Sequence, residues 1–254
     1  MSGLKKLDYD GEIDNVSVLS GLAGLESLTL TNLHDCRDIS PLTALSKLTS
    51  LKLTSLVLSQ PSMFRGGKPL YDISFLSDLT KLEYLNLSGN NIEDISPIAR
   101  MTGLRELYLS SNIYITNIEP LSRLTKLEKL DLDFNGITDV SPLSNLTEME
   151  ELNLKCNIIT DISPLSKLTE LTVLNLAANE ISDISPLYNL DKLQELDIGE
   201  SGFMQSALRP NPVSQSDVEA FQQAHPDCNV IASFFDESIW SYLESYADFR
   251  ANRW

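Results

Sequence analysis

The stretch Leu82-Glu83-Tyr84-Leu85-Asn86-Leu87-Ser88-Gly89-Asn90 returns 22 residues later as Leu104-Arg105-Glu106-Leu107-Tyr108-Leu109-Ser110-Ser111-Asn112. The shared pattern, Leu-x-x-Leu-x-Leu-x-x-Asn, recurs at 127–135, 149–157 and 171–179, so successive asparagines are 22, 23, 22 and 22 residues apart. Weaker copies begin at Leu4, Leu25, Leu48 and Leu193, which gives nine strand units in all. A fixed internal period of this size indicates a stacked array of repeats.

Each unit continues into a second short element, which is clearest as Asp-Ile-Ser-Pro or Asp-Val-Ser-Pro. Copies of this motif stand at 38–41, 94–97, 139–142, 161–164 and 183–186. Serine followed by proline is typical of the start of a helical turn, because the hydroxyl can cap a backbone amide and proline has no N–H to leave unpaired. We therefore expect a short 3-10 turn, capped by the serine, in each repeat.

Alternation within each Leu-x-Leu segment predicts which side chains face inward. Leu85 and Leu87 should point into the array and Asn86 away from it. One unit cannot bury its leucines alone, so neighbouring units stack and their strands pair in parallel. The asparagine column at 90, 112, 135, 157 and 179 should lie inside, where its amides can pair with backbone groups at the turns. The pattern predicts an α/β solenoid over residues 1–200, a leucine-rich-repeat horseshoe with a parallel concave sheet and 3-10 turns on the convex side.

Residues 201–254 are predicted to form a C-terminal capping unit with helical structure. The segment 212–231 looks like a terminal unit, in which Ser216 and Glu219 have capping-box spacing and Val218 and Phe221 share a helix face. Farther on, a stripe with steps of 4, 3, 4 and 3 predicts an amphipathic aromatic helix at Phe235, Ile239, Tyr242, Tyr246 and Phe249. This helix either covers the open end of the array, or faces a partner or a second copy.

The full cycle, Leu-x-x-Leu-x-Leu-x-x-Asn-x-Ile-x-Asp-Ile-Ser-Pro-Leu, resembles the bacterial internalin-type leucine-rich repeats over residues 4–200. The resemblance implies a curved solenoid whose inner sheet surface binds a protein ligand, often on a host cell. Because the first strand candidate begins at Leu4, we expect neither the helical N-terminal cap nor the export signal that are usual in surface internalins. We therefore expect a cytoplasmic protein from the sequence as written, and a surface or secreted one if that sequence is trimmed.

Side chains that flank the second and third leucines of each unit should point off the concave sheet and form the candidate binding surface. In the middle units this surface combines tyrosines, which are frequent binding hot spots, with carboxylates, which steer a basic partner. The candidate ligand-binding residues are Tyr84, Asn86, Glu106, Tyr108, Lys129, Asp131, Asp133, Phe134, Glu151 and Asn153. The alternative is a merely solvated sheet in which tyrosine is favoured by its β propensity.

The charge of the chain narrows the class of partner. There are 36 acidic and 19 basic residues, a formal net charge of -17, which disfavours nucleic acid and favours a basic protein. The same charge could also serve solubility alone. No stretch reaches the roughly 18 apolar residues of a membrane span. An insertion near 57–69 exceeds the repeat and is interpreted either as a second contact with the partner or as a tolerated loop.

Catalytic, metal and cofactor chemistry has little support in the sequence. His34 and His225 are the only histidines, and the repeat register brings neither beside a serine or cysteine. The three cysteines are far apart, without the spacing of a disulfide framework or a zinc site. The chain is therefore expected to be a protein-interaction module and not an enzyme. The alternatives are an acidic inhibitor or immunity-type protein that occludes a basic effector, the recognition part of a larger enzyme, and a purely structural role.

Overall fold

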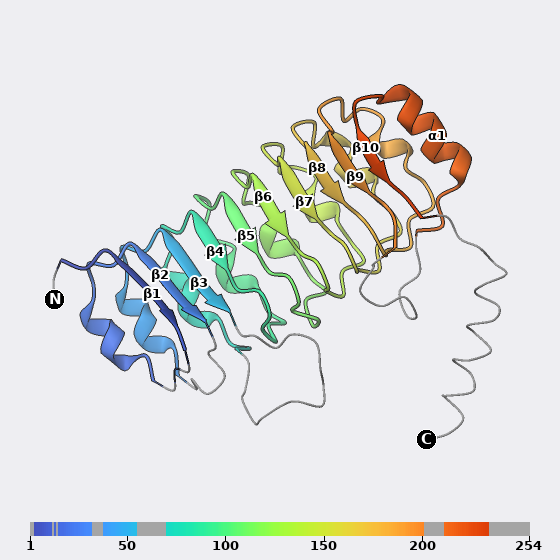
Figure 1. Ribbon diagram of the computed structural model, residues 1–254. Coiled ribbons are helices and arrows are strands. Elements are labelled where there is room, and N and C mark those ends of the chain that lie inside the picture. The colour runs from blue at the N-terminus through green and yellow to red at the C-terminus, as the bar shows by residue number, and fades with distance from the viewer. Residues whose placement is uncertain are drawn as a thin grey trace, which may run out of the picture.

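The computed structural model describes residues 3–11, 13, 15–31, 38–54, 70–200 and 211–233. Within these ranges the strands form one ten-stranded parallel sheet in sequential order. The strands are β1 Lys6–Asp10, β2 Ser27–Thr31, β3 Ser50–Thr54, β4 Tyr84–Asn86, β5 Glu106–Tyr108, β6 Lys129–Asp131, β7 Glu151–Asn153, β8 Val173–Asn175, β9 Glu195–Asp197 and β10 Asn229–Ile231. Figure 1 shows them stacked along one axis, with the helical turns on the opposite side. The predicted solenoid is confirmed.

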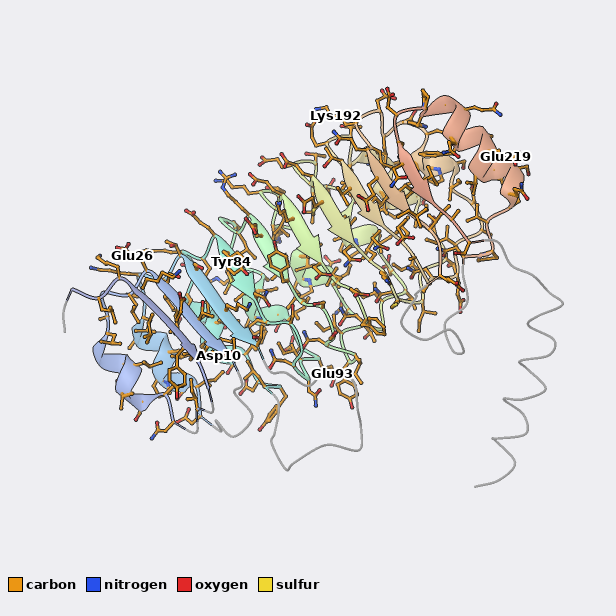
Figure 2. The ribbon with its side chains drawn as sticks, viewed as in Figure 1. Asp10, Glu26, Tyr84, Glu93, Lys192 and Glu219 are labelled. Atoms are coloured by element: carbon orange, nitrogen blue, oxygen red, sulfur yellow. The ribbon has the colours of Figure 1, made fainter. Side chains whose placement is uncertain are left out.

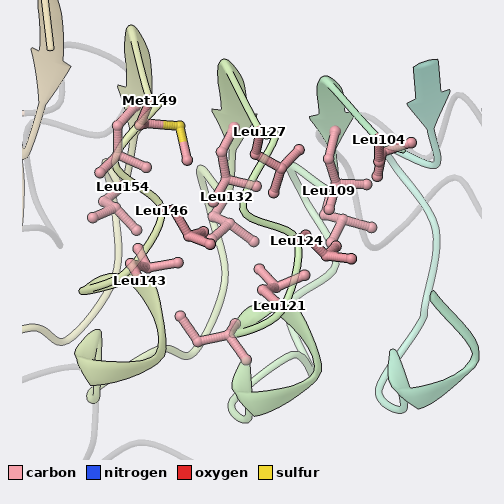
Figure 3. Packing of buried hydrophobic residues seen from close by; sticks show 14 of the residues in the cluster. Leu104, Leu109, Leu121, Leu124, Leu127, Leu132, Leu143, Leu146, Met149 and Leu154 are labelled. Carbon is pink, nitrogen blue, oxygen red and sulfur yellow. The ribbon is translucent and has the colours of Figure 1, made fainter. Parts of the chain in front are cut away.

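The inward leucines of neighbouring repeats lie in register. Leu85 is paired with Leu107, and Leu107 with Leu130, at the central position of three adjacent strands. All three side chains are at most 2% exposed. Figure 3 shows how leucines from the strands and turns of successive repeats, together with Met149, fill the space between sheet and turns. The core is one continuous apolar column, and each repeat contributes a layer to it.

Short 3-10 turns close the side opposite the sheet. They are η1 Ser17–Gly21, η2 Ser40–Ala44, η4 Ser74–Asp78, η5 Ser96–Ile98, η6 Glu119–Leu121, η7 Ser141–Leu143, η8 Ser163–Lys167 and η9 Ser185–Leu187. The turn type is as predicted, but the expected serine cap is wrong. In η8 the carboxylate of Asp161 accepts from the backbone N of Ser163 at 2.8 Å, and the serine makes no capping bond. Aspartate caps because its side chain reaches the amide two residues ahead.

The asparagine column forms the predicted ladder inside the array. Asn157 Nδ2 donates to the carbonyl oxygens of Leu132, at 3.0 Å, and Leu154, at 2.9 Å. Its Oδ1 accepts from the backbone N of Ile137 at 3.0 Å, so one amide ties two repeats together. Asn211, which the repeat pattern did not reveal, takes the next position in the ladder. It donates to Leu176 and Ile198 and accepts from Ile181.

The C-terminal part of the sheet differs from the prediction in two details. Strand β10 pairs with β9 as a tenth strand, where nine units were expected. Helix α1, Gln215–Ala224, buries Val218 and Phe221 as predicted, but its N-cap is Ser214, not Ser216. Ser214 Oγ accepts from the backbone N of Asp217 at 3.1 Å. The insertion near 57–69 and the aromatic stripe from 235 to 249 lie outside the described residues.

Replacing Leu130 by alanine should lower the free energy of unfolding by about 2 to 5 kcal/mol, because it opens a cavity between two layers that cannot collapse freely. Leu130 is 2% exposed. Chemical denaturation monitored by circular dichroism measures the change. An unchanged midpoint would show that Leu130 does not face the core.

The ladder offers a matched pair of variants. Asn135 Oδ1 makes no hydrogen bond with any described residue, because the β5 repeat is one residue longer and Ile115 N bonds back to Asn112 O instead. Asn157→Ala should therefore destabilise the protein by about 1 to 2 kcal/mol more than Asn135→Ala, because it also leaves the buried Ile137 N–H without its hydrogen-bond acceptor. Equal losses in parallel denaturation curves would contradict this role of the amide oxygen.

Candidate functional site

The ten candidate residues lie together on the middle of the sheet. Strands β4 to β7 supply two each, and Asp133 and Phe134 follow β6. Lys129, Glu106 and Tyr84 occupy one register column, while Asp131, Tyr108 and Asn86 occupy the central one. Figure 2 labels Tyr84 on this sheet. All are half-buried except Glu151, which is exposed. We call these ten residues the sheet patch.

Most polar residues of the central column have a structural task that the sequence did not predict. Each accepts a hydrogen bond from the backbone N two residues ahead, at the point where its strand ends. The accepting oxygens belong to Asn86, Asp131, Asn153, Asn175 and Asp197, with distances from 3.0 to 3.2 Å. The signal was present in the sequence as a recurring Asn or Asp at this position. These side chains are held rigidly, so their remaining polar atoms have fixed positions.

Tyr108 breaks this pattern. It takes the central position in β5, where the neighbouring strands carry Asn86 and Asp131, and a phenol cannot make the same short-range cap. Its ring instead lies against the ring of Tyr84, with centroids 5.6 Å apart and planes tilted by 44°. The Tyr108 hydroxyl donates to Glu106 Oε2 at 2.9 Å. An aromatic pair, fixed by a carboxylate, thus replaces a local structural cap.

Burial and the bond to Glu106 have a clear electrostatic effect. Desolvation comes first, the hydrogen bond to Glu106 second, and together they raise the pKa of Tyr108 well above its usual value of 10.0. The phenol therefore keeps its proton throughout the physiological range. At physiological pH it is a neutral phenol, and the bond to Glu106 orients its hydroxyl.

Two neighbouring carboxylates sit beside the tyrosines. Burial raises the pKa of Asp131, although hydrogen bonds from Asp133 N and from the side chains of Ser110 and Asn153 oppose the shift. Burial and the adjacent charge of Asp131 raise the pKa of Asp133 to about 6, despite the nearby Lys155. Asp133 Oδ1 is buried and makes no hydrogen bond with any described residue. A desolvated acid pair is thus held on the sheet surface at a cost in stability.

The patch also contains an ion pair and a depression. Lys129 Nζ lies 2.6 Å from Glu151 Oε1, and this bond raises the pKa of the lysine. Beside it, an open depression of about 250 Å³ is lined by residues of β5 to β8, among them Tyr108, Asp131 and Asn153. Residues of four repeats therefore line this hollow.

Phe134 has a different place from the strand residues. It stands just before the ladder residue Asn135, with a φ of 52°, and its backbone N donates to Lys155 O. Gly89, Ser111, Cys156 and Ala178 share this left-handed conformation at the same repeat position. Phe134 therefore belongs to the turn after β6, at the border of the sheet patch.

No group of three or more His, Cys, Asp or Glu residues able to hold a metal occurs in the described part of the chain. Within the same residues, no helix has the length and apolar character needed to cross a bilayer.

Comparisons with known proteins agree with this architecture. The family model for leucine-rich repeats in two copies matches residues 80–123 and 125–167. An internalin C2 of Listeria monocytogenes is 34% identical, with a TM-score of 0.66, and the alignment covers 76% of this chain and 80% of that one. The chain belongs to the internalin-type leucine-rich-repeat proteins.

Other solved structures place this internalin-type chain among larger relatives. InlF of Listeria monocytogenes is 30% identical with a TM-score of 0.74, and the alignment covers 92% of this chain. The chain spans 62% of the length of InlF. The plant peptide hormone receptor RGFR1, solved in complex with RGF2, shares the fold at 17% identity and a TM-score of 0.65. No curated protein matches the sequence.

For this internalin-type protein, the acid pair predicts an unusual dependence of stability on pH. The pKa of Asp133 is about 6 in the folded state and 3.8 in the reference state, so between these values the folded chain holds more protons. This group therefore makes the free energy of unfolding fall as pH rises from about 4 to 6. Asp133→Asn should raise that free energy at pH 7 by about 1 kcal/mol, after allowance for partial exposure, and change little at pH 3.5.

Thermal unfolding of Asp133→Asn across this pH range measures the effect, and Asp161→Asn is the control. Hydrogen bonds from the Ser163 backbone and side chain lower the pKa of Asp161, so its replacement should give no gain at pH 7. A loss of stability at pH 7 in Asp133→Asn would mean that the carboxylate is not penalised by burial.

Proposed function

We propose that the chain is a non-enzymatic module that binds a protein ligand on its sheet face, through the sheet patch. Leucine-rich-repeat proteins are in general protein-interaction modules. The observation that carries the proposal is Tyr108, where the local cap of the neighbouring strands is given up for an aromatic pair. A pair of oriented tyrosines on a rigid sheet has the properties of a binding hot spot, because little side-chain entropy is lost when a partner covers it.

The size of the hollow supports a protein over a small molecule. Pockets for small ligands are enclosed and have volumes of roughly 300 to 1,000 Å³. The depression of about 250 Å³ is smaller, and it is open to solvent. A sheet surface with this shallow hollow suits a partner that contributes its own surface and covers several repeats at once.

The charge of the patch supports a basic ligand. Its four carboxylates are Glu106, Asp131, Asp133 and Glu151, and its one lysine is already paired with Glu151. With a formal net charge of -17 on the whole chain, long-range forces attract a cationic protein and repel nucleic acid. An inhibitor that occludes a basic effector would use the same surface, and so would the recognition part of a larger enzyme.

The test is a pair of double variants. Proteins are captured from an extract of the source organism, each candidate is purified, and its affinity for the chain is measured by calorimetry. Tyr84→Ala with Tyr108→Ala should weaken binding by about 30-fold or more, the loss expected from one hot spot of about 2 kcal/mol. Tyr71→Ala with Tyr114→Ala removes two tyrosines that lie outside the strands and are 69% and 52% exposed. This control should bind within about twofold of the wild type. Equal affinities for both double variants would overturn the proposal.

A further inference from the structure

The depression beside Tyr108 has a definite internal chemistry. Leu130 and Leu152 lie at its base on β6 and β7, but their side chains pack into the core and are only 2% and 1% exposed. Tyr108 borders it on the β5 side and Val173 on the β8 side. The hollow therefore has an apolar side chain on each of two sides, Tyr108 and Val173, as suits the alkyl part of a long side chain.

Three polar side chains around this hollow keep acceptor positions that no intramolecular donor occupies. Asp131 already receives three hydrogen bonds, and a carboxylate has about four acceptor positions, so one remains. The side-chain oxygens of Asn153 and Asn175 accept from Lys155 N and Ala177 N, and each amide oxygen has a second lone pair. Lys129, the one cation in the lining, is held by Glu151 at 2.6 Å. A group that brings only donors would complement this set.

The negative charge near the hollow also favours a positively charged group. Asp131 lines the hollow, and Asp133 follows it two residues on with a buried oxygen that has no hydrogen-bond donor among the described residues. Two carboxylates that share partial burial repel each other, and a nearby positive charge relieves both the repulsion and the loss of hydration. A neutral or anionic group would leave these costs in place.

We propose that this depression receives a long cationic side chain, arginine or lysine, from the protein ligand. The alkyl part lies between Tyr108 and Val173, the cation donates to Asp131 and the free lone pairs of Asn153 and Asn175, and the Tyr108 ring contributes a cation–π contact. This inference rests on the proposed function, because it states which part of the ligand the sheet patch recognises.

The inference is tested with three blocked amino acids, N-acetyl-arginine amide, N-acetyl-lysine amide and N-acetyl-citrulline amide. Citrulline has nearly the shape of arginine but no charge. Each is titrated into the whole chain labelled with ¹⁵N, and backbone amide shifts are followed. Arginine and lysine should give saturable shifts centred on residues 131–133 and 153–155, while citrulline should give none. Comparison of the two saturable curves shows which cation the hollow prefers.

Asp131→Asn and Asp197→Asn provide a matched pair. Both aspartates occupy the central column and accept from the backbone N two residues ahead, at 3.1 and 3.0 Å, but only Asp131 lines the depression. Asparagine retains the accepting oxygen in both, so the fold should be preserved. Asp131→Asn should weaken binding of the cations about tenfold, as expected for loss of one charge-assisted hydrogen bond. Asp197→Asn should bind them like the wild type.

Three outcomes would overturn the inference: shifts spread evenly over the acidic surface, equal binding of citrulline, or equal losses in the two variants. The tyrosine double variant tests the proposed function separately. If the protein ligand needs Tyr84 and Tyr108 but the cations do not bind, the sheet face remains the binding site and only the cation subsite fails. If the cations bind but the tyrosine double variant binds the protein ligand as tightly as the wild type, the proposed function fails and the cation subsite stands.

Discussion

Backbone pairing between neighbours is the constraint on which this structure depends. A three-residue strand such as β5 cannot satisfy its own amides and carbonyls, and one layer of leucines cannot exclude water from itself. Both needs are met by the next repeat, which must present its backbone N–H and C=O groups and its leucines in the same strand register. The asparagine ladder enforces that match, because one side chain such as Asn157 bonds to the backbone of its own repeat and of the preceding one.

The same constraint leaves fewer outward positions free than alternation along a strand suggests. Asn153 and Asn175 point away from the core, yet each one closes the backbone at the end of its strand. An outward polar side chain is thus not by itself a recognition group. Tyr108 has no such local bond, although its neighbours Asn86 and Asp131 in the column do, and this departure from the pattern is the basis of the proposed binding role.

The sequence predicted the parallel sheet, the 3-10 turns and the ladder because these features follow from periodic residues with one dominant partner each. It misassigned the cap of each turn, because both Asp and Ser can cap amides two or three residues ahead, and in η8 the Asp161 carboxylate accepts from the amide of Ser163. It missed Asn211 because ten residues separate that side chain from the position where the period would place it. The columns of the sheet patch were predictable, whereas the pairing of Tyr84 with Tyr108 and the burial of Asp133 depend on side-chain conformations that periodicity does not contain.

The extra residue in the β5 repeat has a mechanical consequence. Ile115 N bonds within its own turn, so the junction between the β5 and β6 repeats has one interlocking hydrogen bond fewer than the junction between the β6 and β7 repeats. In a linear array, cooperativity passes from one repeat to the next through these junctions. Under force or heat, this seam favours separation of the array into two blocks, with the tyrosine pair on one block and the acid pair on the other.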